Sequence, residues 1–364
     1  MTLEEIYKKA LKLENLTFSE AKQLYTKAPL SELTFIANQL RQKHKKNSNN
    51  VGWIIDRNVN ITNVCFAQCK FCNFCRTVNS PDAYITTLEQ YKQKIEETIS
   101  VGGNQLLLQG GMHPQLGLEF YTNLFKELKK LYPNLKLHAL SPTEIVHLSK
   151  KSNLSYKQVL EKLIEAGLDS LPGAGAEILS DRVRKIVSPS KCTSQQWLDV
   201  MAEAHKLNIP TSATMMFGFI ETIDERLEHL FKIRNLQAQK PQNNYGFITF
   251  VPWPFQANQT KLSKMFPFIH KITPNEYIRL IAMSRIILNN IENIQTSWLT
   301  VGQKVAQFTL WAGANDMGSI MIEENVVSAA GAKFKLNDAQ IQNLITEAGF
   351  EPKMRNQKYE FIEN

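Results

Sequence analysis

From residue 47 onward, short β-rich runs alternate with segments of helical period, and this alternation restricts the possible folds more than any other feature of the chain. Helices that follow strands in this way connect parallel strands of one sheet. Eight runs are candidate strands: 53–61, 105–109, 136–140, 168–171, 211–215, 246–251, 294–298 and 314–320. Eight such strands predict an α/β protein with a closed (β/α)8 TIM barrel, whose working face is the carboxyl end of the strands.

The segment before the barrel has a different character. Residues 1–46 have helical period and end in a polar linker, so we expect an N-terminal helical extension, followed by a barrel with a C-terminal helical region over 47–364. The net charge is +8, and the densest basic run is RQKHKK at 41–46. In this peripheral position the run is expected to be a solvated face rather than a nucleic-acid site.

The overall composition is that of an ordinary globular protein. With 43% hydrophobic and 21% charged residues, the chain can bury a large core without a metal. We find no apolar run near the roughly 20 residues of a membrane span, and the N-terminus lacks the apolar core of a signal peptide. A cytoplasmic protein is therefore expected.

Four of the five cysteines lie between positions 65 and 75, directly after the first predicted strand. Cys65, Cys69 and Cys72 have Cys-x3-Cys-x2-Cys spacing on one loop. Three thiolates can hold three irons of a 4Fe-4S cluster and leave the fourth iron open. An open iron suits an enzyme that binds S-adenosylmethionine there and cleaves it to a 5′-deoxyadenosyl radical.

Other interpretations of the cysteines remain open at this point. Cys75 could complete a four-thiolate zinc site, because Cys72 and Cys75 have knuckle spacing. A zinc-stabilised nucleic-acid-binding module and an iron–sulfur electron carrier are the corresponding non-enzymatic hypotheses. The isolated Cys192 is expected to be a buried, inert residue.

Polar and glycine residues follow several predicted strands, at the same rim as the cysteines. Gln109, Gly110 and Gly111 end the second strand, where glycines let the backbone approach a ligand closely. The candidate cofactor contacts on later strands are Ser141, Glu177 and Arg182. His113 and His138 are the histidines expected to point into the barrel mouth.

These motifs occur in an order that resembles one family. Besides the cysteines, they include GGMHP at 110–114, HALSP at 138–142, GAGAE at 173–177, MMFG at 215–218 and SWLTVGQKVAQ at 297–307. The chain resembles the cyclic dehypoxanthinyl futalosine synthase family over about residues 52–355. The resemblance implies a radical S-adenosylmethionine barrel with the cluster at its mouth, Phe71 and Gly110 framing the adenosyl group, and Glu177 and Arg182 near the cofactor.

The resemblance also implies a reaction, in the futalosine route to menaquinone. The deoxyadenosyl radical removes the C4′ hydrogen from the ribose of dehypoxanthine futalosine, and the carbon radical adds to the benzoate ring. Loss of a proton and an electron restores aromaticity, with His113 as the candidate base. A flavodoxin or ferredoxin is expected as the reducing partner. Neither nucleic acid nor a membrane is expected as a partner. Cys75 departs from the family pattern, which has an aromatic residue at this position. The alternative enzyme is the related aminofutalosine synthase.

Overall fold

The computed structural model describes residues 1–46, 48–331 and 335–362. Its strands are β1 (Asn50–Ile54), β2 (Asp56–Asn60), β3 (Gln105–Gln109), β4 (Lys136–Ala139), β5 (Thr211–Phe217), β6 (Phe247–Pro254), β7 (Asn293–Ile294), β8 (Asp316–Ser319) and β9 (Glu351–Met354). Its helices are α1 (Leu3–Leu11), α2 (Phe18–Lys27), α3 (Leu30–His44), α4 (Leu88–Ser100), α5 (Leu118–Leu131), α6 (Pro142–Ser152), α7 (Tyr156–Glu165), α8 (Asp181–Val187), α9 (Ser194–Lys206), α10 (Ile223–Ala238), α11 (Lys261–Met265), α12 (Pro274–Ile287), α13 (Trp298–Val301), α14 (Gln303–Trp311), the short 3₁₀ helix η1 (Ser328–Ala330) and α15 (Asp338–Glu347).

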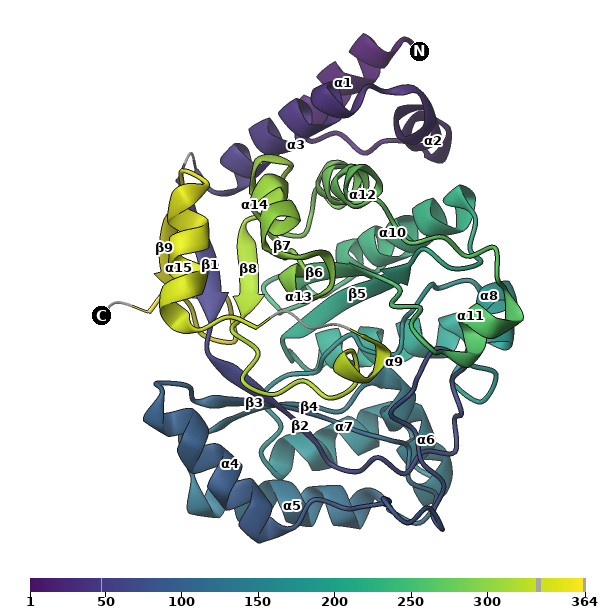
Figure 1. The fold of residues 1–364 in the computed structure, drawn as a ribbon, viewed down its shortest axis with the longest axis vertical. Coiled ribbons are helices and arrows are strands. Elements are labelled where there is room, and N and C mark those ends of the chain that lie inside the picture. Colours follow the sequence, from purple (N-terminus) through teal and green to yellow (C-terminus); the bar gives the residue numbers. More distant parts are fainter. Residues whose placement is uncertain (47, 332–334, 363–364) are drawn as a thin grey trace.

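The strands form a ring of parallel pairings (Figure 1). β2 pairs with β3 and β3 with β4, while β5 pairs with β6 and β6 with β7. Single parallel bridges join His138 to Ser170, Leu171 to Thr211 and Gln295 to Asp316, and β8 returns to β1. The predicted closed barrel is therefore confirmed, although the fourth predicted strand, 168–171, pairs only through these bridges.

The first and last strands differ from the sequence prediction. The predicted strand 53–61 is divided at Ile55 into β1 and β2. The reason is that β1 pairs with β8 and β9, whereas β2 pairs with β3. β9 was not predicted. Its sequence EPKM contains Pro and charged residues without an apolar alternation, so only its pairing with β1 makes it a strand.

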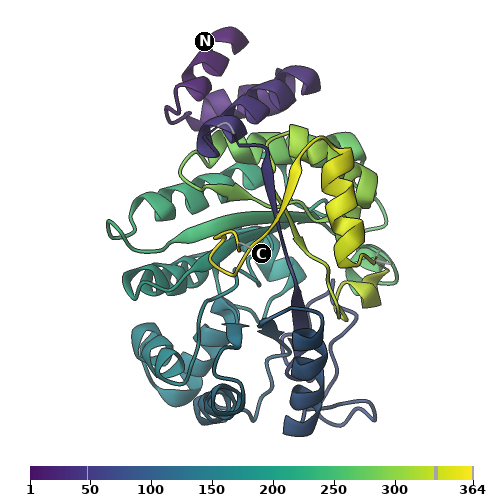
Figure 2. The same cartoon turned by 90° about the vertical axis from the view of Figure 1, so that its left-hand side faces the viewer.

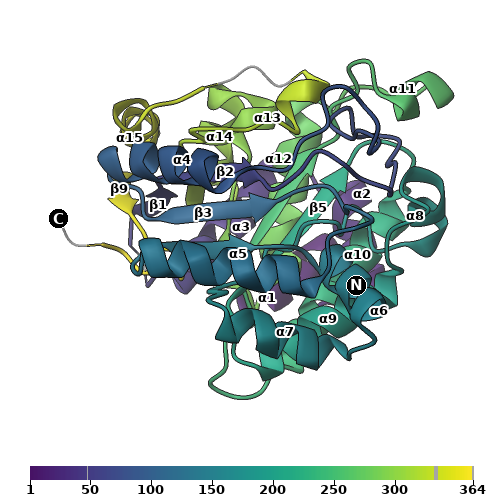
Figure 3. The same ribbon diagram turned by 90° about the horizontal axis from the view of Figure 1, so that it is seen from below.

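Helices cover the outside of the ring and bury an apolar stripe against it. In α5 the buried residues Leu118, Tyr121, Phe125 and Leu128 recur at helical spacing. α4 and α5 lie along the outer side of β2 and β3 (Figure 3). Because the helices lie outside the ring, the carboxyl ends of the strands remain free to carry the loops of the site.

The N-terminal extension is a separate helical layer on one side of the barrel (Figures 1 and 2). Capping boxes begin α1 at Thr2 and α2 at Thr17, and α3 packs along α12. The expectation of a fully solvated basic run at 41–46 is wrong for Arg41. Its side chain is fully buried, with the guanidinium 4.4 Å from the centre of the Phe350 ring.

Within the described ranges, no helix combines the length and the apolarity that crossing a membrane requires.

Candidate active site

The loop that carries the cysteine motif starts directly after β2 and is pinned at both ends. The backbone N–H of Arg76 donates to the carbonyl of Asn63 at 2.8 Å, and that of Cys65 donates to the carbonyl of Arg76 at 3.0 Å. The Asn63 side chain also donates to the carbonyl of Asp82 at 2.7 Å. The residues between 65 and 76 are thereby closed into a compact loop at the carboxyl end of the first strand.

The glycine pair after β3 lets that strand approach the cysteine loop. A Cβ atom on Gly111 would lie 2.1 Å from the carbonyl oxygen of Val64, so only glycine fits there. The next residue, Met112, donates its backbone N–H to the sulfur of Cys65 at 3.3 Å. Amide donors of this kind stabilise sulfur ligands that carry negative charge, so the close approach has a chemical consequence for the loop.

The three cysteines of the motif have different environments. A hydrogen bond from Cys75 lowers the pKa of Cys65 to about 6, whereas burial raises the pKa of Cys69 to about 12. The ammonium of Lys191 is buried nearby; burial opposes its charge, but Cys69 and Glu177 raise its pKa. A buried cation beside thiols stabilises their thiolate form.

These features fit an iron–sulfur cluster with three protein ligands. Among the described residues, no three His, Cys, Asp or Glu side chains converge closely enough to hold a single metal ion. The cysteines therefore support a cluster through their number, loop and surroundings and not through a preformed coordination geometry. The thiol of Cys75 also faces this region, and donates to the carbonyl oxygen of Cys65 at 3.1 Å.

A cavity of about 450 Å³ runs from the cysteine loop into the barrel. Nearly all of the residues predicted to hold the cluster or the cofactor line it: Cys65, Phe71, Cys69, Cys72, Gln109, Gly110, Gly111, Ser141 and Glu177. They come from loops after different strands, which only closure of the barrel brings together. The cavity continues downward to residues near the C-terminus, among them Arg355, Gln357 and Tyr359.

Two predicted residues are placed elsewhere. Arg182 is exposed and is not among the cavity-lining residues; its guanidinium binds Glu225 at 2.5 Å. Of the two predicted cofactor contacts, only Glu177 lines the cavity, and the arginine of α8 that binds it is Arg184. His113 is buried beside the loop but does not line the cavity, and its Nδ1 accepts a hydrogen bond from the N–H of Gln115 at 3.1 Å.

Comparison with known proteins agrees with this geometry. Residues 59–233 match the radical SAM superfamily, and residues 244–364 match the CofH/MqnC C-terminal region. The chain is 40% identical over 362 residues to cyclic dehypoxanthine futalosine synthase of Halalkalibacterium halodurans, with 100% of this chain and 95% of the relative covered. The chain belongs to the radical SAM family of this synthase. The Streptomyces coelicolor synthase is 39% identical, over 99% of this chain and 89% of its own.

The same family contains a second named activity, which the sequence alone did not lead us to consider. A 5-amino-6-(D-ribitylamino)uracil–L-tyrosine 4-hydroxyphenyl transferase of Methanococcoides burtonii is 37% identical, over 91% of this chain and 92% of its own. Membership in the radical SAM family is thus established. The relatives that carry the two named activities are almost equally similar to this chain, at 40% and 37% identity.

Solved structures support the fold of this radical SAM protein. Methylornithine synthase matches with a TM-score of 0.69 at 16% identity, over 95% of this chain and 97% of its own. The FeFe-hydrogenase maturase HydG from Carboxydothermus hydrogenoformans matches with a TM-score of 0.72 at 17% identity, over 98% of this chain and 80% of its own. At these identities the likeness concerns the barrel and not the reaction.

Several residues in or beside the cavity of this radical SAM barrel were not singled out from the sequence, among them the two cations that bind Glu177. Glu177 accepts from Lys191 at 2.8 Å and from Arg184 at 3.3 Å, so two cations hold it at the mouth. Neither cation lies in a motif, and no pattern in the chain indicates them. On β2, by contrast, Asp56, Asn58 and Asn60 alternate as polar residues in a predicted strand, and this period of two is a signal for side chains that face the barrel interior.

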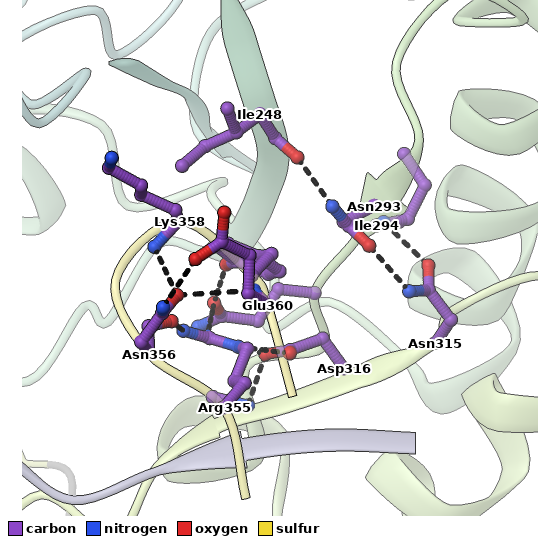
Figure 4. Close-up of polar contacts among 12 residues, drawn as sticks. Ile248, Asn293, Ile294, Asn315, Asp316, Arg355, Asn356, Lys358 and Glu360 are labelled. Carbon is purple, nitrogen blue, oxygen red and sulfur yellow. Dashed lines mark hydrogen bonds and ion pairs between the residues drawn. The ribbon is translucent and has the colours of Figure 1, made fainter. Parts of the chain in front are cut away.

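The C-terminal hairpin, which we define as residues 351–362, closes the lower end of the cavity. Arg355 directly follows β9 and pairs in a bridge with Phe361. Its guanidinium binds Asp316 of β8 (Figure 4). The same guanidinium lies 3.6 Å from the centre of the Tyr359 ring. A charged pair with a stacked aromatic ring thus forms the floor of the site, far below the cysteines.

Proposed function

We propose that the protein is a radical S-adenosylmethionine cyclase that converts dehypoxanthine futalosine to cyclic dehypoxanthine futalosine in menaquinone biosynthesis. The single observation that carries the proposal is the 40% identity to the Halalkalibacterium halodurans synthase over the whole chain. The motif SWLTVGQKVAQ at 297–307, on which the resemblance partly rests, lies partly in the cavity lining, through Ser297, Trp298 and Leu299.

In this proposal the residues of the mouth hold the cofactors. Cys65, Cys69 and Cys72 would hold a 4Fe-4S cluster, which together with S-adenosylmethionine supplies a 5′-deoxyadenosyl radical for removal of the C4′ hydrogen. Phe71, Gln109, Gly110, Gly111, Ser141 and Glu177 line the adjoining wall and would bind S-adenosylmethionine. The barrel wall below them keeps water from a carbon radical of the substrate.

A base is required because the ring loses a proton when it becomes aromatic again, and the electron lost with the proton would return to the 4Fe-4S cluster held by the three cysteines. His113 was predicted for this role, but His138 is the histidine that lines the cavity. His138 contacts the hydroxyl of Ser170, and burial lowers its pKa to about 3, so its imidazole is neutral but weakly basic. Its position in the cavity, and not its basicity, makes it the candidate. We therefore extend the proposal to His138, with His113 as the comparison. His138→Gln should still cleave S-adenosylmethionine but give less cyclised product per deoxyadenosine, and His113→Gln should give the normal ratio.

The test of the proposed function is turnover with defined substrates. The anaerobically reconstituted protein is incubated with S-adenosylmethionine, a reductant and dehypoxanthine futalosine, and in parallel with L-tyrosine and 5-amino-6-(D-ribitylamino)uracil. We expect deoxyadenosine together with a product two hydrogen atoms lighter than dehypoxanthine futalosine. Product from the tyrosine mixture alone would assign the transferase activity. A third mixture contains an aminofutalosine synthase substrate, and product from this mixture alone would assign that enzyme. A flavodoxin or ferredoxin would serve as the electron donor.

A further inference from the structure

Three amide side chains on the inner face of the barrel have unpartnered polar atoms. Asn58 and Asn60 of β2 and Gln105 of β3 are 6%, 2% and 4% exposed, and all three line the cavity. Within the described part of the chain, Oδ1 of Asn58, Nδ2 of Asn60 and Oε1 of Gln105 have no hydrogen-bond partner. Burying such groups without partners is unfavourable, so they indicate a ligand that completes them.

Two buried amides elsewhere in the same barrel, Asn293 and Asn315, are bonded through both their oxygen and their nitrogen. Asn315 accepts from Arg285 at 2.6 Å and from the N–H of Ile294 at 3.0 Å, and donates to Asn293 at 2.9 Å. Asn293 in turn donates to the carbonyl of Ile248 at 2.7 Å (Figure 4). Neither Asn293 nor Asn315 lines the cavity. Asn293 and Asn315 are thus satisfied, whereas Asn58, Asn60 and Gln105 each leave one polar atom unpaired at the cavity.

The charges around the cavity restrict the kind of ligand. Arg355 is paired with Asp316, and Lys191 with Glu177. Gln105 donates to the buried Asp56 at 3.0 Å. The deep half of the described cavity therefore presents neutral amides, the carboxyl group of Asp56 and the paired Arg355, and not a free cation for a phosphate or carboxylate. Neutral amides offer both donors and acceptors, which matches hydroxyl groups.

We propose that Asn58, Asn60 and Gln105 form a binding site for the hydroxyl groups of a sugar or a polyol. Asn58 and Asn60 project to the same face and lie about 6.6 Å apart along the strand, a span that one pentose covers. In register, Asn60 is beside Gln109 just below the glycine pair, whereas Gln105 is beside Asp56 deeper in the barrel. The site thus lies beneath the cysteine loop, in the wall of the same cavity.

This site deepens the proposed function, on which it rests for the identity of the sugar: the ribose of dehypoxanthine futalosine. Binding is measured by calorimetry on the reconstituted protein with S-adenosylmethionine and an oxidised cluster, so that no turnover occurs. The probes are dehypoxanthine futalosine and its analogue without the 2′- and 3′-hydroxyls. Wild-type protein should bind the analogue about tenfold more weakly, as expected for loss of hydrogen bonds to buried groups.

The variants test the three residues directly. Asn58→Leu, Asn60→Leu and Gln105→Leu should each bind the substrate about tenfold more weakly, and should discriminate less between substrate and analogue. Asn58→Ala removes the amide without adding bulk and should behave in the same way. Unaltered substrate affinity in all of these variants, or equal binding of substrate and analogue by the wild type, would overturn the site.

Thermal unfolding separates a ligand site from a structural role. Asn58→Leu removes no partner bond, so its Tm should equal or exceed that of the wild type, whereas Asn315→Leu should lower Tm by several degrees. An equal loss of Tm in both variants would overturn the proposal. If the wild type binds dehypoxanthine futalosine but forms no cyclised product, the proposed function fails and this site stands. A wild type that does not bind it overturns the site as stated.

Discussion

Arg355 and Asp316 form a buried ion pair between the C-terminal hairpin and the eighth strand of the barrel. Nη2 of Arg355 lies 2.9 Å from Oδ1 of Asp316, and Nε lies 2.5 Å from Oδ2 (Figure 4). Asp316 is 1% exposed and Arg355 is 4% exposed. A bidentate pair of this kind fixes the orientation of both groups, so it fastens β9 to the barrel.

Replacing only one member of this pair should destabilise the fold strongly. Arg355→Met leaves the Asp316 carboxylate buried without its cation, and should lower the free energy of unfolding by about 3–5 kcal/mol. The double variant with Asp316→Asn should recover part of the loss. Urea denaturation measures both. Lys353→Met serves as the control, because the Lys353–Glu351 contact is 4.0 Å long and exposed. Equal effects of Arg355→Met and Lys353→Met would contradict the assignment.

The three cysteines of the motif should be required for the cluster and not for the fold. Cys65→Ala, Cys69→Ala and Cys72→Ala should each lose the cluster and S-adenosylmethionine cleavage while keeping the circular dichroism spectrum of the wild type. The reason is that the loop packs on its own small apolar cluster, outside the main core. Iron analysis should give about four irons per wild-type chain. Unfolding of all three variants would instead indicate a structural metal.

Cys75 separates the cluster from the zinc hypothesis. A fourth thiolate ligand would occupy the iron that S-adenosylmethionine needs, so we expect Cys75→Ser to keep its iron content and cleavage activity. A serine hydroxyl can replace the thiol as donor to the carbonyl of Cys65. Cys75→Tyr, which restores the aromatic residue of the family pattern, should also keep its cluster. Loss of metal from Cys75→Ser as complete as from Cys72→Ala would support the four-thiolate site.

Glu177 and Arg182 should now differ in their effect on cofactor binding. Glu177 lines the cavity, and Glu177→Gln should weaken S-adenosylmethionine binding by about tenfold. Arg182→Ala should leave binding unaltered, because Arg182 pairs with Glu225 outside the cavity. Calorimetry with the oxidised cluster compares the two. The opposite order would return Arg182 to the site and remove Glu177.

The buried His229 should make the fold sensitive to acid. Its Nδ1 accepts from the N–H of Leu179 at 3.1 Å, and burial lowers the pKa of His229 to about 3. Between about pH 6.5 and pH 3 the unfolded chain binds a proton that the native protein does not. Stability is therefore present above this interval and decreases as the pH falls, by up to ~1.4 kcal/mol per pH unit for this group.

His229→Gln should reduce that slope by about one proton, as measured by denaturation at a series of pH values. The exposed His270 provides the control, because His270→Gln makes the same replacement at the surface. An identical slope for wild type and His229→Gln would show that another group causes the acid sensitivity.

Much of the mouth of the site was predictable because its signals are local. The spacing of Cys65, Cys69 and Cys72, and the glycines at 110 and 111, follow strands whose period is visible in the sequence. In a parallel barrel the carboxyl ends of all strands meet at one rim, so a motif after a strand is already placed there. The alternation of Asp56, Asn58 and Asn60 carried the same kind of information about the interior.

The sequence by itself therefore determined the barrel, the cysteine loop and the face of the barrel that carries this loop, since strand period, helix caps and cysteine spacing act over a few residues. Only the tertiary structure decided that Arg184 and Lys191 hold Glu177, that Arg182 points away, and that Arg355 closes the floor against Asp316. Which charge pairs with which depends on helix rotation and on contacts between distant segments. Their energies appear only when burial removes water, and no local pattern records them.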